Sequence, residues 1–100
     1  MKRYAIYQLS DDNQKIRDLY FMSAKEIEAI SDEYDLVGLV SANSFDQVFG
    51  IGNMQRSRIE LISDEMRSVS VGDIIEDMST GETVVVANYG FDKIQMKEAV

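Results

Sequence analysis

The sequence contains no histidine, cysteine, tryptophan or proline. The absence of cysteine excludes a disulfide framework, thiolate chemistry and cysteine-based zinc sites. The absence of histidine removes the commonest general base and a common metal ligand, so most enzymatic mechanisms lose their usual residues. Six glycines and no proline among 100 residues argue against a disordered chain or a linker. These absences predict a domain that is held together by packing alone and is not an enzyme.

The chain has the size and apolar content of one domain. Its 100 residues are 45% hydrophobic, enough to bury one core, and we expect a single domain over residues 1–100. The N-terminal segment turns polar by Gln8 and Ser10, and no apolar run approaches the length of a membrane span. The lack of cysteine also fits a reducing compartment. We therefore expect a cytoplasmic protein that has no membrane partner.

Acidic residues outnumber basic residues by 18 to 10, which gives a net charge of −8. Residues 26–55 and residues 68–92 contain acidic side chains and no Lys or Arg. Binding to nucleic-acid phosphates depends on Lys and Arg, so this distribution disfavours direct contact with DNA or RNA. Two interpretations stay open: the acidic surface only keeps the protein soluble, or it docks on a basic surface of a partner protein.

The pattern of apolar and polar residues predicts an α+β fold. Ser23 and Glu26 have the spacing of a capping box, which predicts a short helix over residues 24–30. Ser44 can cap a second helix over residues 45–49, and we expect a loop over residues 50–55. In segment 56–65 the apolar residues fit neither the spacing of a helix nor the alternation of a strand. We predict strands at residues 4–9, 16–22, 34–40, 74–75, 83–86 and 91–94, the first two paired as a hairpin. The expected architecture is an antiparallel sheet of about five or six strands with one or two short helices on one face.

The last third of the chain is a tight series of turns and strands. At the Gly72-Asp73 turn we interpret Asp73 as a structural residue whose carboxylate accepts hydrogen bonds from nearby backbone N–H groups, with contact to a partner as the alternative. Gly90 is expected to adopt a positive φ in the last turn, and Phe91 is expected to fill the core. Tyr89 either anchors a partner or covers the edge of the core.

Short motifs follow one another in a distinctive order: Tyr4-Ala-Ile-Tyr-Gln-Leu9, Arg17-Asp-Leu-Tyr-Phe-Met22, Tyr34-Asp-Leu-Val37, Arg67-Ser-Val-Ser-Val-Gly-Asp-Ile-Ile75 and Tyr89-Gly-Phe-Asp-Lys-Ile94. Together they resemble the YodL-like domain over essentially the whole chain. Segment 42–65 departs from that pattern, because it looks shorter and lacks the Pro and His residues expected there. The resemblance implies a protein carried by plasmids, conjugative elements or phages of Gram-positive bacteria, often beside anti-restriction genes. It also implies similarity to proteins that act on the actin-like cell-shape machinery.

Two segments resemble sites for a bound ion or nucleotide only weakly. Asp73, Glu76 and Asp77 are the group of carboxylates that comes nearest to a metal site, but the Asp-x-Asp-x-Asp-Gly pattern of a calcium loop does not occur. The Gly50-Ile51-Gly52 segment is followed by no third glycine and no Lys-Ser or Lys-Thr pair, as a phosphate loop requires. We therefore predict no metal and no cofactor, and we keep a carboxylate-dependent enzyme as the lowest alternative.

The leading hypothesis is a non-enzymatic binding module from a mobile genetic element that inhibits a host defence nuclease of the CRISPR or restriction type. Its carboxylates would occupy basic residues that the nuclease otherwise presents to nucleic acid. The residues chosen for partner binding are Asp32, Glu33, Asp35, Glu76, Asp77, Glu82 and Tyr89. The alternative is an adaptor that binds the host actin-like cell-shape machinery or a conjugation apparatus through apolar contacts. Only the first of the two predicts binding that weakens steeply as salt rises.

Overall fold

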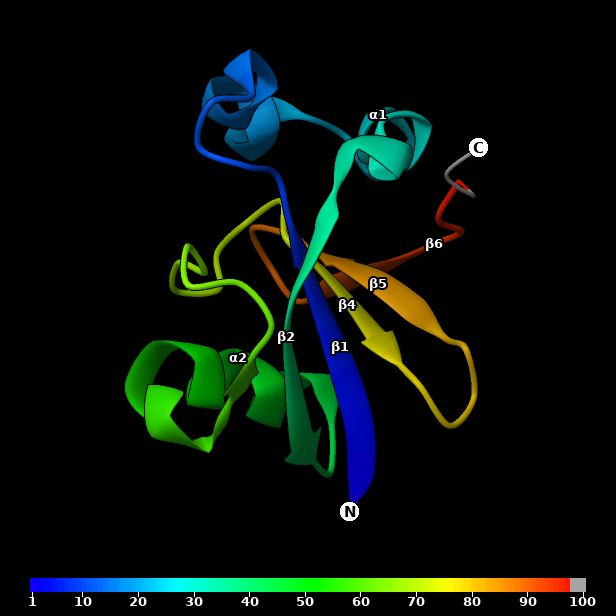
Figure 1. Cartoon of the computed structure of the whole chain (residues 1–100). Coiled ribbons are helices and arrows are strands. Elements are labelled where there is room, and N and C mark those ends of the chain that lie inside the picture. Colours follow the sequence, from blue (N-terminus) through cyan, green and yellow to red (C-terminus); the bar gives the residue numbers. More distant parts are fainter. Residues whose placement is uncertain (98–100) are drawn as a thin grey trace.

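A computed structural model describes residues 1–97 of the chain. Its centre is a six-stranded sheet in the order β3-β2-β1-β4-β5-β6, antiparallel at every pairing. The strands are β1 (Lys2–Gln8), β2 (Asp35–Ala42), β3 (Glu60–Leu61), β4 (Ile74–Asp77), β5 (Thr83–Val86) and β6 (Phe91–Ile94). The N-terminal strand therefore lies in the middle of the sheet, between β2 and β4 (Figure 1). The predicted α+β class and antiparallel sheet are confirmed.

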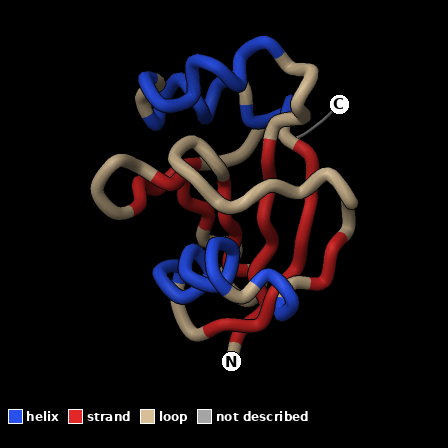
Figure 2. Tube along the Cα trace, turned by 90° about the vertical axis from the view of Figure 1, so that its left-hand side faces the viewer, coloured by secondary structure: helices blue, strands red, loops and turns tan. Residues whose placement is uncertain are grey.

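The helices lie on both faces of the sheet, whereas the sequence predicted helices on one face. Two are α-helices, and three are short 3₁₀ helices that we label η: η1 (Gln14–Phe21), α1 (Ala24–Ala29), η2 (Ser31–Glu33), α2 (Phe45–Met54) and η3 (Arg56–Arg58). In Figure 2 the pair η1 and α1 lies at the top and α2 lies near the bottom. The helices bury different faces of the sheet, because α2 packs on one buried cluster and η1 and α1 pack on the other. The predicted capping box of α1 is formed, because Ser23 Oγ accepts from the Glu26 N–H at 3.2 Å and Glu26 Oε1 accepts from the Ser23 N–H at 3.0 Å.

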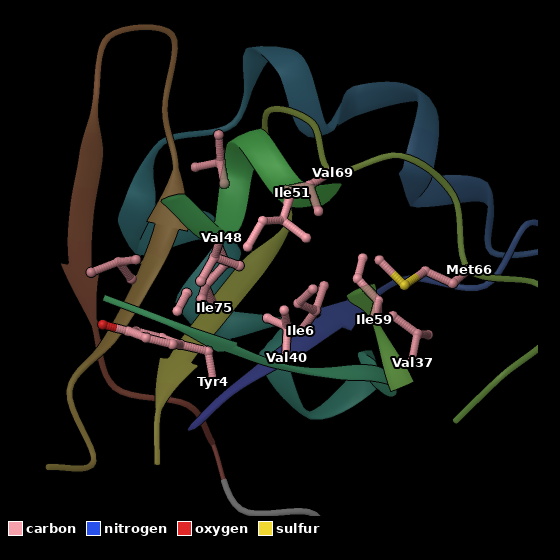
Figure 3. Packing of buried hydrophobic residues seen from close by; sticks show 13 residues of the cluster. Tyr4, Ile6, Val37, Val40, Val48, Ile51, Ile59, Met66, Val69 and Ile75 are labelled. Atoms are coloured by element: carbon pink, nitrogen blue, oxygen red, sulfur yellow. The ribbon is translucent and has the colours of Figure 1, made fainter. Parts of the chain in front are cut away.

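Alternation along the strands divides the buried side chains into two clusters. Neighbours in a strand point to opposite faces, so Ile75 joins the cluster under α2 while Ile74 joins the cluster under η1 and α1. Val48 and Ile51 of α2 pack in the first cluster (Figure 3). The second cluster lies under η1 and α1 and contains Leu9, Leu19, Ile27, Tyr34, Ile74 and Val85.

Segment 16–22 forms the 3₁₀ helix η1 and the linker after it, so the predicted hairpin with β1 is wrong. Asn13 begins the helix, since its side-chain oxygen accepts from the Lys15 N–H at 2.9 Å. Both edges of β1 are occupied by β2 and β4, which leaves no place for a further partner strand. Of the consecutive apolar residues in η1, only Leu19 is buried, whereas Tyr20 and Phe21 are 58% and 82% exposed.

The predicted loop over residues 50–55 is also wrong, because α2 continues through it to Met54. Burial of Ile51 against the sheet stabilises the longer helix. Gly52 meets Val69 at close range, and a Cβ atom at position 52 would lie 2.4 Å from Val69 Cγ2. The ambiguous segment 56–65 contains η3 and the two-residue strand β3, which pairs with β2.

Candidate functional site

Asp77 ends β4 and organises the turn that leads to β5. Its side chain is 2% exposed, and it accepts hydrogen bonds from the Ser79 N–H at 2.9 Å, from Ser79 Oγ at 2.6 Å and from Lys2 Nζ at 3.0 Å. The hydrogen bonds from Ser79, with the ammonium group of Lys2, lower the pKa of Asp77 to about 2. The backbone carbonyl of Asp77 also accepts from the Gly81 N–H at 2.7 Å. The prediction that Asp77 faces a partner is therefore wrong, because its carboxylate holds this turn together.

Glu76 precedes Asp77, and strand alternation directs its side chain to the opposite face of the sheet. Glu76 Oε1 accepts from the Tyr7 hydroxyl at 2.9 Å. Burial, together with this hydrogen bond, raises the pKa of Tyr7 to about 12. Glu76 and Asp32 line the same shallow hollow, which Lys97 also lines. The structure thus brings two of the predicted acidic residues together, with a base beside them.

Two more predicted residues form ion pairs within the chain. Glu33 Oε2 lies 2.5 Å from Lys15 Nζ, and Glu33 Oε1 accepts from Asn13 Nδ2 at 3.1 Å. Both hydrogen bonds lower the pKa of Glu33, and the one from Lys15 has the larger effect. Glu82 pairs with Lys93 of β6 at 3.4 Å. Exposed pairs of this kind add little stability. In each pair, however, the lysine already compensates the charge of the glutamate without a partner protein.

A separate group of carboxylates gathers where β2 begins. Asp35, the first residue of β2, lines a small hollow together with Asp11 and Glu65, and Asp32 lies three residues before it. Arg67 lies among them and pairs with Asp11 at 2.6 Å. We call Asp11, Asp35 and Glu65, together with Asp32 from the hollow that Glu76 lines, the acidic end of the sheet. Asp32 and Asp35 were predicted from the sequence, whereas Asp11 and Glu65 were not, because only the folded topology brings those segments together.

An open groove lies between the η1–α1 segment and the turn that connects β5 to β6. Tyr20 and Tyr89 line it from these two sides, and Tyr89 is 96% exposed. Asp92 of β6 lines the same groove. Phe21 packs edge-on against Tyr20, with 5.3 Å between the ring centroids. Tyr89 was among the predicted residues, whereas Tyr20 was missed because the sequence predicted a strand in its place.

Asp73 has the structural role that the sequence predicted. Its Oδ2 accepts from the Ser70 N–H at 2.9 Å and from Gln8 Nε2 at 3.0 Å. Gln8 Oε1 in turn accepts from the Arg67 N–H at 3.0 Å, so β1 is tied to the segment before β4. Burial raises the pKa of Asp73 to about 6, although the two hydrogen bonds to its carboxylate act in the opposite direction.

The glycines beside these turns have positive φ. Gly90 has a φ of 78°, as predicted. Gly72 has a φ of 95°, and a Cβ atom at this position would lie 2.7 Å from Leu19 Cβ. Phe91 packs against the cluster under α2, with its ring centroid 6.0 Å from that of Phe45, but it is partly exposed. The prediction that Phe91 packs on the core is confirmed, with less burial than expected.

The carboxylates considered for a metal are not gathered around one point, since Asp73 is bound to Gln8 while Glu76 and Asp77 point to opposite faces. Residues 1–97 contain no group of three or more side chains that could hold a metal ion. Over the same range, no helix is long and apolar enough to cross a membrane.

Comparisons with protein-family models, with curated proteins and with solved structures found no match.

Proposed function

We propose that this protein is a non-enzymatic binding module from a mobile genetic element that docks on a basic surface of a host defence nuclease and inhibits it. The nuclease would be of the CRISPR or restriction type, and the carboxylates would take the place of nucleic acid on its Lys and Arg side chains. The site proposed for this contact is the acidic end of the sheet, with Glu76 beside Asp32. Neither nucleic acid nor a membrane takes part in the proposed contact.

The observation that carries the proposal is that three carboxylates of the acidic end form no ion pair within residues 1–97. The ion pairs found within residues 1–97 engage Asp77, Glu60, Glu33, Asp11 and Glu82. Asp32, Asp35 and Glu65 are exposed and form no ion pair within that part of the chain. Exposed carboxylates without a cation keep their attraction for basic groups on a partner, and they accelerate association. The resemblance to YodL-like domains supplies the mobile-element context.

A plasmid-transformation assay tests the proposal. Cells that carry a CRISPR or restriction system reject a targeted plasmid, and expression of this protein should restore transformation in at least one such system. The triple variant Asp32→Asn, Asp35→Asn, Glu65→Gln should lose that rescue, because it removes the unpaired carboxylates. The matched variant Glu33→Gln, Glu60→Gln, Glu82→Gln should keep it, because those three charges are already paired inside the chain. A triple variant that rescues as well as the wild type would contradict the proposal.

A second candidate is the adaptor that binds the host actin-like cell-shape machinery or a conjugation apparatus. One observation favours it: Leu36, Leu61 and Ile62 are 37%, 44% and 50% exposed, and they lie on β2 and on or directly after its neighbour β3. Exposed apolar side chains near each other are typical of protein contacts. Binding through them would change little with salt, whereas binding through the acidic end would weaken steeply. Measuring the affinity for a captured host protein at low and high salt therefore separates the two candidates.

A further inference from the structure

The groove between Tyr20 and Tyr89 combines apolar, aromatic and acidic residues, a composition that suits the apolar stem and the cationic head of a long basic side chain. Two tyrosines and Asp92 line it with the polar residues Ser23 and Asn88, beside apolar residues that include Ile27, Val71 and Val85. No Lys or Arg lines it. Asp92 is exposed and forms no ion pair within residues 1–97. Aromatic faces attract cations, and a nearby carboxylate adds a charge-assisted hydrogen bond.

The two rings are presented by well-anchored segments. The Ala87 N–H donates to the Gly90 carbonyl at 3.0 Å and closes the turn that carries Tyr89. Tyr20 follows the buried Leu19 and contacts Phe21 edge-on. Tyr89 itself is 96% exposed and so contributes almost nothing to the core. A large ring placed in solvent on an ordered turn is the arrangement of an interaction anchor, because Tyr gives contact area at a low cost in side-chain entropy.

We propose that this groove binds an arginine side chain of a partner protein, with the guanidinium against the rings of Tyr20 and Tyr89 and paired with Asp92. The hollow measures about 310 Å³, at the low end of the range for small-molecule pockets, which suits one side chain. Arginine fits better than lysine because its planar guanidinium stacks on aromatic rings and pairs with a carboxylate at the same time. The inference deepens the proposed function, on which it rests, because a nuclease surface that binds nucleic acid is rich in arginine.

The test is a titration of the isotope-labelled protein, followed by NMR, with the peptide N-acetyl-Gly-Arg-Gly-amide. The control peptide carries citrulline, the neutral isostere, in place of arginine. We expect saturable shifts at the amides of Tyr20, Asn88, Tyr89 and Asp92 with the arginine peptide and none with the citrulline peptide. Tyr89→Ala and Asp92→Asn should each weaken binding by roughly three- to tenfold, while Tyr89→Phe, which keeps the ring, should bind as the wild type does.

Three outcomes would overturn the inference: no saturable shift at the groove, equal shifts with the citrulline peptide, or an affinity that is unchanged in Tyr89→Ala. Shifts confined to the acidic end would likewise place the cation elsewhere. Because Tyr89 is exposed, an unchanged thermal melt of Tyr89→Ala confirms that folding is not the cause of lost binding. No host protein takes part in the titration. A negative titration therefore leaves the inhibitor proposal standing, and a negative transformation assay leaves arginine binding standing.

Discussion

The side-chain amide of Gln8 donates to the carboxylate of Asp73 at 3.0 Å, although the two residues are 65 positions apart in the chain. Gln8 ends the central strand, and Asp73 precedes the strand that pairs with it. Both side chains are buried, at 1% and 2% exposed. An unsatisfied buried polar group costs free energy. Each of these residues satisfies a polar group of the other, so both can be buried without that cost.

Asp73 makes stability fall as the solution becomes less acidic. Its pKa is about 6 in the folded protein, above the ordinary value of 3.8. The folded state therefore holds this proton more tightly, so the stabilisation is complete below pH 4 and is lost as the pH rises through 6. Asp73→Asn keeps an acceptor for Gln8 and Ser70 but cannot ionise. We expect urea denaturation at a series of pH values to show a shallower decline between pH 4 and 6 in this variant. Parallel curves for wild type and variant would contradict the assignment.

Asp77 acts with the opposite sign and at lower pH. Its pKa is about 2 in the folded protein, below the ordinary 3.8, so it stabilises the fold above about pH 4 and loses that effect as the pH falls toward 2. Asp77→Asn should be less stable at neutral pH and should lose less stability between pH 4 and 2. Asp64→Asn, at an exposed position, controls for the loss of one negative charge. An acid denaturation curve identical to that of the wild type would show that the Lys2 and Ser79 contacts do not hold in solution.

Gly72 should tolerate no side chain, for two separable reasons. Its φ of 95° costs an L-residue about 1–2 kcal/mol, and a Cβ atom would overlap with Leu19. Gly81 has a φ of 80° with nothing within 4 Å of an added Cβ, so Gly81→Ala measures the backbone cost alone. We expect Gly72→Ala to lower the free energy of unfolding by about 3 kcal/mol and Gly81→Ala by about 1 kcal/mol. Equal losses would mean that η1 moves away without cost.

Phe91→Ala should remove the contact with Phe45 and part of the cover over the cluster under α2. Because Phe91 is partly exposed, we expect a loss of about 2 kcal/mol, less than the 3–5 kcal/mol that is usual for a fully buried ring. Tyr89→Ala, two residues earlier, should change the free energy of unfolding by less than about 0.5 kcal/mol. Chemical denaturation of both variants checks the pair, and similar losses would show that the closing strand packs differently.

Features decided by a few neighbouring residues could be predicted from the sequence. The capping box at Ser23 and Glu26, the positive φ at Gly90 and the structural role of Asp73 depend on local geometry. Segment 16–22 could not be predicted in this way, because its composition fits a strand. The segment forms η1 instead of a strand because both edges of β1 pair with segments that come later in the chain. Gly52 was likewise interpreted as part of a loop, since nothing local reveals its close approach to Val69.

The candidate site was predicted only in part, for the same reason. Alternation along β4 separates Glu76 from Asp77, and this could have been deduced from the strand assignment alone. The approach of Asp11 and Glu65 to Asp35, and of Tyr20 to Tyr89, required the topology. Each of these sets joins segments that are far apart in the chain, so no window of sequence contains the site.

The central place of β1 also governs the order in which the molecule can fold. β1 leaves the ribosome before both of its neighbours in the sheet, and its pairing with β4 joins Tyr4 to Asp77. Until that segment has been synthesised, one edge of β1 has no partner strand. Contacts of such long range slow folding, and an unpaired edge can bind other chains. A nascent chain that stops before residue 74 should therefore need a chaperone, whereas the whole chain can cover this edge with its own β4.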